Sequence, residues 1–287
     1  MRKVKAAATQ MACTWNRTEN LERAEALVRK AAEDGANVIL LQELFETPYF
    51  CQQQKPAYMD LATSMEENPA VRRFREIAKE LKVVLPISFY ERMGNTAFNT
   101  AAIIDADGTV LGIYRKTHIP DGLPYAEKYY FTPGDTGFRV WQTRYGKIGV
   151  GICWDQWFPE AARAMALMGA ELLLYPTAIG SEVYIEVDSH IHWRNTMAGH
   201  AAANMIPVVA SNRIGTESDG TVMTFYGGSF IANQHGEIVV EAENDKAGTV
   251  TAEFDLDALA KERREWGIYR DRRPEMYQII LTHGMEK

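Results

Sequence analysis

Cysteine is scarce in this sequence, because Cys13, Cys51 and Cys153 are the only three among 287 residues. An odd number of widely separated cysteines predicts neither a disulfide framework nor a CxxC metal site. Long apolar runs are also missing, and no stretch of about 18 apolar residues is present to cross a bilayer. The first residues, MRKVKAAATQ, lack the basic-then-apolar pattern of a secretory signal. We therefore expect a cytoplasmic protein with reduced thiols, no metal and no membrane partner.

Positive charge is in the minority, with 31 Lys and Arg against 38 Asp and Glu and a formal net charge of −7. Such a balance argues against a nucleic-acid partner and mildly favours a cationic small molecule as the ligand. Apolar residues make up 46% of the chain, and no low-complexity segment interrupts it. Length and apolar content together predict one folded domain over residues 1–287.

Short apolar runs alternate with amphipathic segments, an order that is typical of a layered α/β domain. The first predicted helix begins after Asn16 or Thr18, either of which can cap it, and ends at Gly35. The other predicted helices lie at 69–81, 159–168, 190–204 and 255–266. Predicted strands lie at 4–12, 38–42, 83–90, 146–152, 171–176, 206–211 and 249–254, with hairpins at 101–115 and around Gly236. A long irregular stretch at 116–138, rich in Pro, Gly and Tyr, is suited to building a site.

Three ionisable residues directly follow predicted strands: Glu43 follows VILLQ, Lys116 follows TVLGIYR and Cys153 follows GVGI. Reactive groups collect at the carboxyl ends of strands in α/β folds, because a rigid sheet holds the loops there. Each residue alone is more often structural or a solvated charge. Their shared position makes the three together a candidate catalytic site.

The chemistry that this trio supports is acyl transfer to a thiol, followed by hydrolysis. A free thiol titrates near about 8.5, so a neighbouring ammonium or helix start is expected to lower its pKa, and Lys116 has that charge. The carboxylate of Glu43 can accept the proton from Cys153 as attack begins. The ammonium and the backbone N–H of Trp154 can then stabilise the negative oxygen that forms on the attacked carbonyl.

The segments around these residues resemble the nitrilase (carbon-nitrogen hydrolase) superfamily. Glu43 in LLQELFETPYF, Lys116 in YRKTHIPDG and Cys153 in GVGICWDQWFPE match its Glu-Lys-Cys triad in that order. The resemblance spans almost the whole chain and implies the four-layer α-β-β-α sandwich of that superfamily, without a cofactor. It also implies that Glu127, in PYAEKYYFTPGD, is the second glutamate that orients the lysine or assists proton transfer.

The same resemblance implies a homo-oligomer, a dimer or larger, and we expect the C-terminal tail from about residue 267 to take part in its subunit contacts. The apolar helices around 161–168 and 198–205 are candidates for burial between subunits, although they are equally suited to the core.

Further segments resemble a branch of the superfamily that hydrolyses a carbamoylated diamine. These are FETPYF, KTHIPDGLPYAEKYYFTPGDTGF, CWDQWFPEAARAMAL and LLYPTAIGSE. The implied reaction converts N-carbamoylputrescine into putrescine, carbon dioxide and ammonia, a step of polyamine biosynthesis. The implied partner of the distal amine is Glu182, with Tyr49 and Trp154 shaping the substrate site. No arginine follows Cys153 closely, so a substrate carboxylate has no matched cation in that segment, whereas an ammonium has aromatic faces and acids.

Three alternatives stay open at the level of the sequence. The substrate can be another small amide, such as a carbamoyl amino acid. His118 lies close to Lys116 in sequence and can replace it in a Cys-His hydrolase mechanism. The chain can also be a non-catalytic binding protein in which Cys153 is a redox-sensitive thiol.

Overall fold

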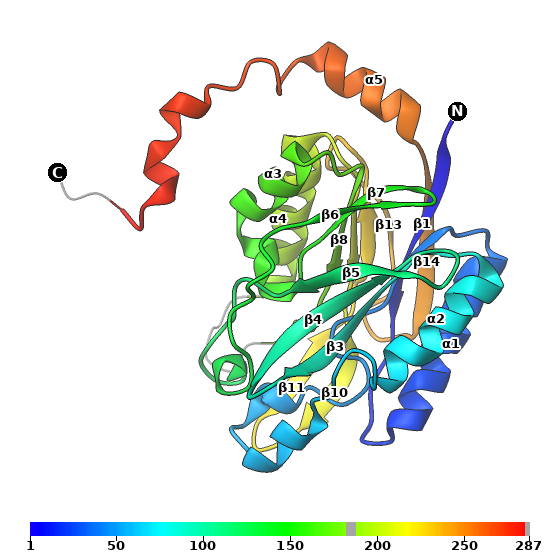
Figure 1. Ribbon diagram of the computed structural model, residues 1–287, viewed down its shortest axis with the longest axis vertical. Coiled ribbons are helices and arrows are strands. Elements are labelled where there is room, and N and C mark those ends of the chain that lie inside the picture. Colours follow the sequence, from blue (N-terminus) through cyan, green and yellow to red (C-terminus); the bar gives the residue numbers. More distant parts are fainter. Residues whose placement is uncertain (182–187, 285–287) are drawn as a thin grey trace.

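The computed structural model describes residues 1–181 and 188–284. Two β-sheets pack face to face, and a pair of helices covers the outer face of each sheet (Figure 1). The four layers follow the order helix, sheet, sheet, helix. The four-layer α-β-β-α sandwich predicted from the sequence is therefore confirmed.

The first sheet combines two groups of three strands, in the orders β14-β1-β2 and β3-β4-β5. A parallel bridge between Val38 and Val84 joins the two groups. Strands β1 and β2 run parallel, whereas β3, β4 and β5 form an antiparallel meander. The strands are β1 Lys3–Gln10, β2 Val38–Leu40, β3 Leu85–Met93, β4 Thr96–Ile104, β5 Val110–Arg115 and β14 Gly248–Asp255.

The second sheet has six strands in the order β13-β12-β9-β8-β7-β6. Its centre is parallel, because β7 pairs with β8 and β8 pairs with β9 in that sense. A separate hairpin, β10-β11, follows β9. The strands are β6 Val140–Thr143, β7 Gly146–Val150, β8 Leu172–Pro176, β9 Val208–Ser211, β10 Ile214–Ser218, β11 Val222–Tyr226, β12 Phe230–Ala232 and β13 Ile238–Glu241.

Helices α1 and α2 lie on the first sheet, and α3 and α4 lie on the second (Figure 1). The cap of α1 is Asn16, whose side chain accepts a hydrogen bond from the Glu19 N–H and so satisfies a donor at the helix start. Gly35, with φ +86°, follows the end of this helix, as expected. The helices are α1 Arg17–Glu33, α2 Pro69–Leu81, α3 Pro159–Leu167, α4 Ser189–Asn204 and α5 Leu256–Trp266.

Successive side chains of the central strands point to opposite faces of each sheet. The core is therefore divided among the three interfaces between the four layers. In β8, Leu172 and Leu174 point between the sheets, whereas Leu173 and Tyr175 point toward α3 and α4. Because both faces of such strands are buried, their sequences are continuous apolar runs. Burial on both faces also holds the strand ends firmly, and these ends present the site.

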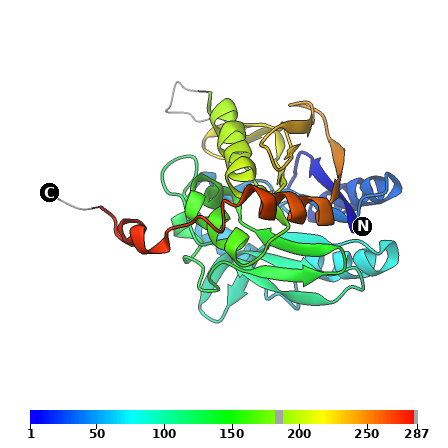
Figure 2. The ribbon, with the colours of Figure 1, turned by 90° about the horizontal axis from the view of Figure 1, so that it is seen from above.

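The sequence failed to predict β6 and the β10-β11 hairpin. Both hairpin strands carry polar and threonine side chains and have exposed positions, so neither forms a marked apolar run. Beyond Gly267 the described chain extends away from the body of the molecule (Figure 2). None of the helices in residues 1–181 and 188–284 combines the length and the apolar content needed to span a membrane.

Candidate active site

The three strand-end residues come from both sheets and meet where the sheets face each other. Lys116 directly follows β5, and Glu43 lies three residues beyond β2 in the same sheet. Cys153 lies three residues beyond β7 of the second sheet and begins a short 3₁₀ turn, Cys153–Trp157. Each sheet therefore delivers part of one constellation from a different part of the sequence.

Lys116 is the centre of a buried ionic cluster. Its Nζ atom lies 2.9 Å from Glu43 Oε1 and 2.7 Å from Glu127 Oε2, and all three side chains are 0% exposed. Glu127 begins the 3₁₀ turn Glu127–Tyr129 within the long loop after Lys116. The structure thus brings together the two acids and the lysine that the sequence singled out.

A neutral hydrogen-bond donor orients each carboxylate. The side-chain amide of Asn99, on β4, donates to Glu43 Oε1 at 2.6 Å, and the Tyr49 hydroxyl donates to Glu127 Oε1 at 2.6 Å. Glu43 Oε2 is buried and has no hydrogen-bond partner among the described residues. That oxygen is therefore available to accept a proton from a reacting group.

The charges of this cluster determine its protonation. Burial alone would lower the pKa of Lys116, but Glu127 and Glu43 outweigh it and hold this pKa well above its usual value. Burial raises the pKa of Glu127 to about 7, with Lys116 opposing the change and Glu43 adding to it. Two carboxylates share one ammonium in a dry site, so Glu127 takes up a proton near neutral pH.

Cys153 occupies a sharp elbow, with φ +43°, a conformation that few non-glycine residues adopt. Burial raises the pKa of its thiol well above the usual value, and Glu43 raises it further, although Lys116 acts in the opposite direction. Lys116 therefore acts on this thiol in the expected direction, but burial and Glu43 outweigh its effect, so the lowered pKa expected for Cys153 is wrong. In the resting protein the thiol is neutral, so attack requires a base at the moment of reaction.

Asp155 fixes this elbow to the loop that follows Lys116. Its carboxylate is buried and accepts hydrogen bonds from the Ile152 N–H at 2.9 Å, the Tyr114 hydroxyl at 2.7 Å and the His118 N–H at 3.0 Å. The His118 ring places Nδ1 2.8 Å from Asp155 and stacks on Phe158, with ring centroids 3.6 Å apart. This geometry favours His118 as a support of the elbow rather than as the base of a Cys-His pair.

Of the three residues predicted to bind substrate, two lie in the part of the chain that the structure describes. Tyr49 is buried, packs against the rings of Tyr125 and Phe225, and reaches the cluster through Glu127. Trp154 directly follows Cys153 and is half-buried. Glu182 lies outside the described residues.

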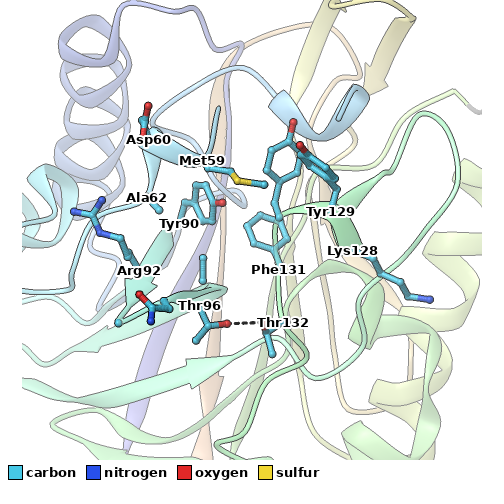
Figure 3. Close-up of a pocket in the computed structure, with 14 residues that line it drawn as sticks. Met59, Asp60, Ala62, Tyr90, Arg92, Thr96, Lys128, Tyr129, Phe131 and Thr132 are labelled. Carbon is cyan, nitrogen blue, oxygen red and sulfur yellow. Dashed lines mark hydrogen bonds between the residues drawn. The ribbon is translucent and has the colours of Figure 1, made fainter. Parts of the chain in front are cut away.

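A separate pocket of about 450 Å³ lies beside the segment that follows Glu127 (Figure 3). Its aromatic wall includes Tyr90, Tyr129 and Phe131, and Arg92 and Lys128 also line it. None of the cluster residues, nor Cys153, lines this pocket, so its volume does not describe the space around the thiol.

Sequence reasoning missed Asn99 and Asp155. A polar residue inside the apolar run FNTAAII was a usable signal for Asn99, because buried polar groups need partners. Asp155 offered a weaker signal, since an acid after a candidate nucleophile fits a helix start equally well.

A sandwich with a cysteine elbow beside a buried Glu-Lys-Glu cluster defines a class of thiol-dependent hydrolase. Residues 5–264 match the carbon-nitrogen hydrolase family model, and the chain belongs to that family.

Individual relatives resemble the chain over nearly its whole length. It is 56% identical to an N-carbamoylputrescine amidase of Solanum lycopersicum over 98% of this chain and 96% of that protein. It is 51% identical to a citrullinase of Francisella tularensis subsp. tularensis, over 98% and 99%. The crystal structure of a carbon-nitrogen hydrolase from Helicobacter pylori G27 is 38% identical, with a TM-score of 0.91 and coverage of 99% and 100%.

Proposed function

We propose that this protein hydrolyses N-carbamoylputrescine to putrescine, carbon dioxide and ammonia, with Cys153 as the nucleophile. The observation that carries the proposal is the fully buried Lys116, paired with Glu43 and Glu127 beside the thiol. The 56% identity to an N-carbamoylputrescine amidase supports the choice of substrate. An amidase of this kind needs a nucleophile, a base and a cation, and the site has all three.

In the first half-reaction, Glu43 removes the proton from the Cys153 thiol as sulfur attacks the ureido carbon. Lys116 and the backbone N–H of Trp154 stabilise the oxyanion that forms. Glu43 then returns the proton to the terminal amino group, and the C–N bond breaks to release ammonia. A carbamoyl group carrying the diamine remains on sulfur as a thioester-type adduct.

In the second half-reaction, Glu43 deprotonates a water molecule that attacks the same carbon. The carbon-sulfur bond breaks, and the proton returns to the Cys153 sulfur. The released carbamic acid decomposes to carbon dioxide and putrescine. Glu127, fixed by the Tyr49 hydroxyl, keeps Lys116 in place through both steps.

Citrulline is the second candidate substrate, because a citrullinase is 51% identical to this chain. Citrulline has the same ureido group on a chain of the same length, but it adds a carboxylate beside the distal amine. No arginine lies among residues 154–158, which directly follow the nucleophile and would be well placed to pair with that carboxylate. We therefore favour the diamine.

The test is ammonia release from N-carbamoylputrescine, citrulline and N-carbamoyl-β-alanine, with Cys153→Ala as the inactive control. N-carbamoylputrescine should have the highest kcat/KM. A higher kcat/KM for citrulline would identify citrulline as the substrate and leave the proposed chemistry unchanged. Absence of ammonia release from all three would contradict the proposal.

We also propose a homo-oligomer in which the tail from about residue 267 contacts another subunit. Large apolar side chains of this tail are exposed, including Met276 at 64%, Ile280 at 57% and Leu281 at 77%. Light scattering should give at least a dimer for the full chain and a smaller mass for a chain that ends at Trp266. A monomeric full chain would contradict this.

A further inference from the structure

The loop that begins at Glu43 and ends at Tyr49 connects two groups of the candidate site. Glu43 is the proposed base, and the Tyr49 hydroxyl holds Glu127. Leu44, next to the base, has φ +48°, a strained conformation for a branched side chain that surrounding contacts must maintain. The backbone of this loop therefore determines where both functional side chains point.

Arg213 holds the backbone of this loop through hydrogen bonds to its carbonyl oxygens. It lies between β9 and β10, and its side chain is completely buried. Its guanidinium donates to the carbonyl oxygens of Leu44 at 2.9 Å, Thr47 at 2.9 Å and Glu43 at 3.2 Å. One planar side chain thus contacts three carbonyls of the loop, and one of these carbonyls belongs to Glu43, the proposed base.

Glu217, on β10, completes the arrangement. One of its oxygens accepts from Arg213 Nη1 at 2.8 Å, and the other accepts from the Tyr49 N–H at 2.6 Å. The pair therefore fixes the loop at both of its ends. Through the Tyr49 hydroxyl, the same connection extends to Glu127.

A buried ion pair is a weak means of increasing stability, because apolar side chains of similar size often stabilise a protein equally well. A guanidinium can, however, direct several donors in a fixed geometry at several acceptors, which neither a lysine nor an apolar residue can do. The rigid fork of Arg213 is therefore better explained by precise placement of the loop than by stability alone.

We propose that Arg213, together with Glu217, is a positioning residue for the catalytic carboxylates Glu43 and Glu127. This inference rests on the proposed roles of Glu43 and Cys153. It assigns a function in catalysis to the β10-β11 side of the molecule, which contributes no reacting group. It also predicts that variants which lose the guanidinium donors and still fold are slowed at the chemical step.

The first test compares Arg213→Lys, which keeps the charge, with Arg213→Met, which removes both charge and donors. We expect kcat to fall about 10-fold in the lysine variant and about 100-fold in the methionine variant, since small displacements of a catalytic group have effects of this size. KM should change by less than kcat does, because Tyr49 is the one proposed substrate-site residue on this loop, whereas Trp154 and Glu182 lie elsewhere in the sequence.

The second test needs no carbamoylated substrate, so it remains informative if the proposed substrate is wrong. The rate at which iodoacetamide alkylates Cys153 is measured by mass spectrometry over a range of pH. If Glu43 accepts the thiol proton, the rate of Cys153 alkylation in the wild type should depend only weakly on pH between about 6 and 8. In Arg213→Met it should rise steeply with pH and resemble the profile of Glu43→Gln.

A matched control is Ile77→Ala, which removes buried side-chain volume from α2 and takes away none of the hydrogen bonds that hold the loop. It should lower the melting temperature without changing kcat or the alkylation profile. If Arg213→Met does not fold, Arg213→Lys and Glu217→Gln provide the same comparison. Folded Arg213 and Glu217 variants with wild-type kcat and a wild-type alkylation profile would overturn the proposal.

Discussion

Lys116 Nζ lies 2.9 Å from Glu43 Oε1, and neither side chain has any exposure to solvent. Taking two charges out of water is costly, and one partner left alone would be strongly unfavourable. The cluster holds a second acid, Glu127, which burial drives toward the neutral form at a pKa of about 7. This concentration of charge in a dry site is typical of catalytic centres.

The first prediction separates the lysine mechanism from a Cys-His mechanism. Lys116→Ala should reduce kcat by at least about 100-fold, the usual size of the loss when an oxyanion donor is removed. His118→Ala should retain much more activity, because His118 contacts Asp155 and Phe158 rather than the cluster. Steady-state ammonia release measures both, with circular dichroism to verify folding. The reverse order of the two losses would favour His118 as the base.

The second prediction concerns the nucleophile. Cys153→Ala should abolish turnover and leave the fold intact, because a small apolar side chain replaces a small thiol. Glu43→Gln should slow the activation of water and let the adduct on Cys153 accumulate. Intact-protein mass spectrometry with N-carbamoylputrescine would detect it. Full activity in Cys153→Ala would end the assignment.

The third prediction is a pH dependence of stability that originates at Glu127. Its ordinary pKa of 4.5 applies to the unfolded chain, and its pKa in the folded protein is about 7. Between these values the folded state retains a proton that the unfolded state releases, so the free energy of unfolding should fall as pH rises. The slope for one proton is at most about 1.4 kcal/mol per pH unit.

The control for this slope is Glu127→Gln, which removes the titrating group and keeps an acceptor for Tyr49. Urea denaturation at several pH values between about 5 and 7 should give a flatter dependence for the variant than for the wild type. Equal slopes in the two proteins would show that Glu127 has an ordinary pKa.

The pattern of the sequence was sufficient to predict a layered α/β domain with Glu43, Lys116 and Cys153 at strand ends, and the resemblance to the carbon-nitrogen hydrolase superfamily implied the four layers. Continuous apolar runs mark strands that are buried on both faces, and strand ends are where reactive side chains collect. It was insufficient for the direction of the Cys153 pKa shift, which depends on burial and on two nearby carboxylates. The sequence predicts which kinds of side chain lie near Cys153, but it does not predict the distances between them.

The β10-β11 hairpin shows why the remaining features escaped prediction. Its strands, IGTES and VMTFY, lack the continuous apolar run of a central strand, so nothing in the sequence marked Glu217, or Arg213 just before the first strand, as buried. Their partners are far away in sequence, since Arg213 lies 166 positions after Thr47. Only the folded chain brings such residues together.

The final prediction concerns selectivity, for which Glu182 is the proposed partner of the distal ammonium. Removing the acid in Glu182→Gln should leave the substrate cation without its partner. We expect kcat/KM for N-carbamoylputrescine to fall by at least about 30-fold, the equivalent of about 2 kcal/mol. Carbamoylated butylamine has no charge at that end, so its kcat/KM should fall much less and it is the control substrate.

A comparison of two charged substrates tests the same assignment. In the wild type, kcat/KM for N-carbamoylputrescine should be much higher than kcat/KM for N-carbamoyl-β-alanine, and the ratio of the two values should be smaller in Glu182→Gln. A wild type that prefers the carboxylate substrate would refute the diamine assignment while leaving the chemistry of Glu43, Lys116 and Cys153 intact.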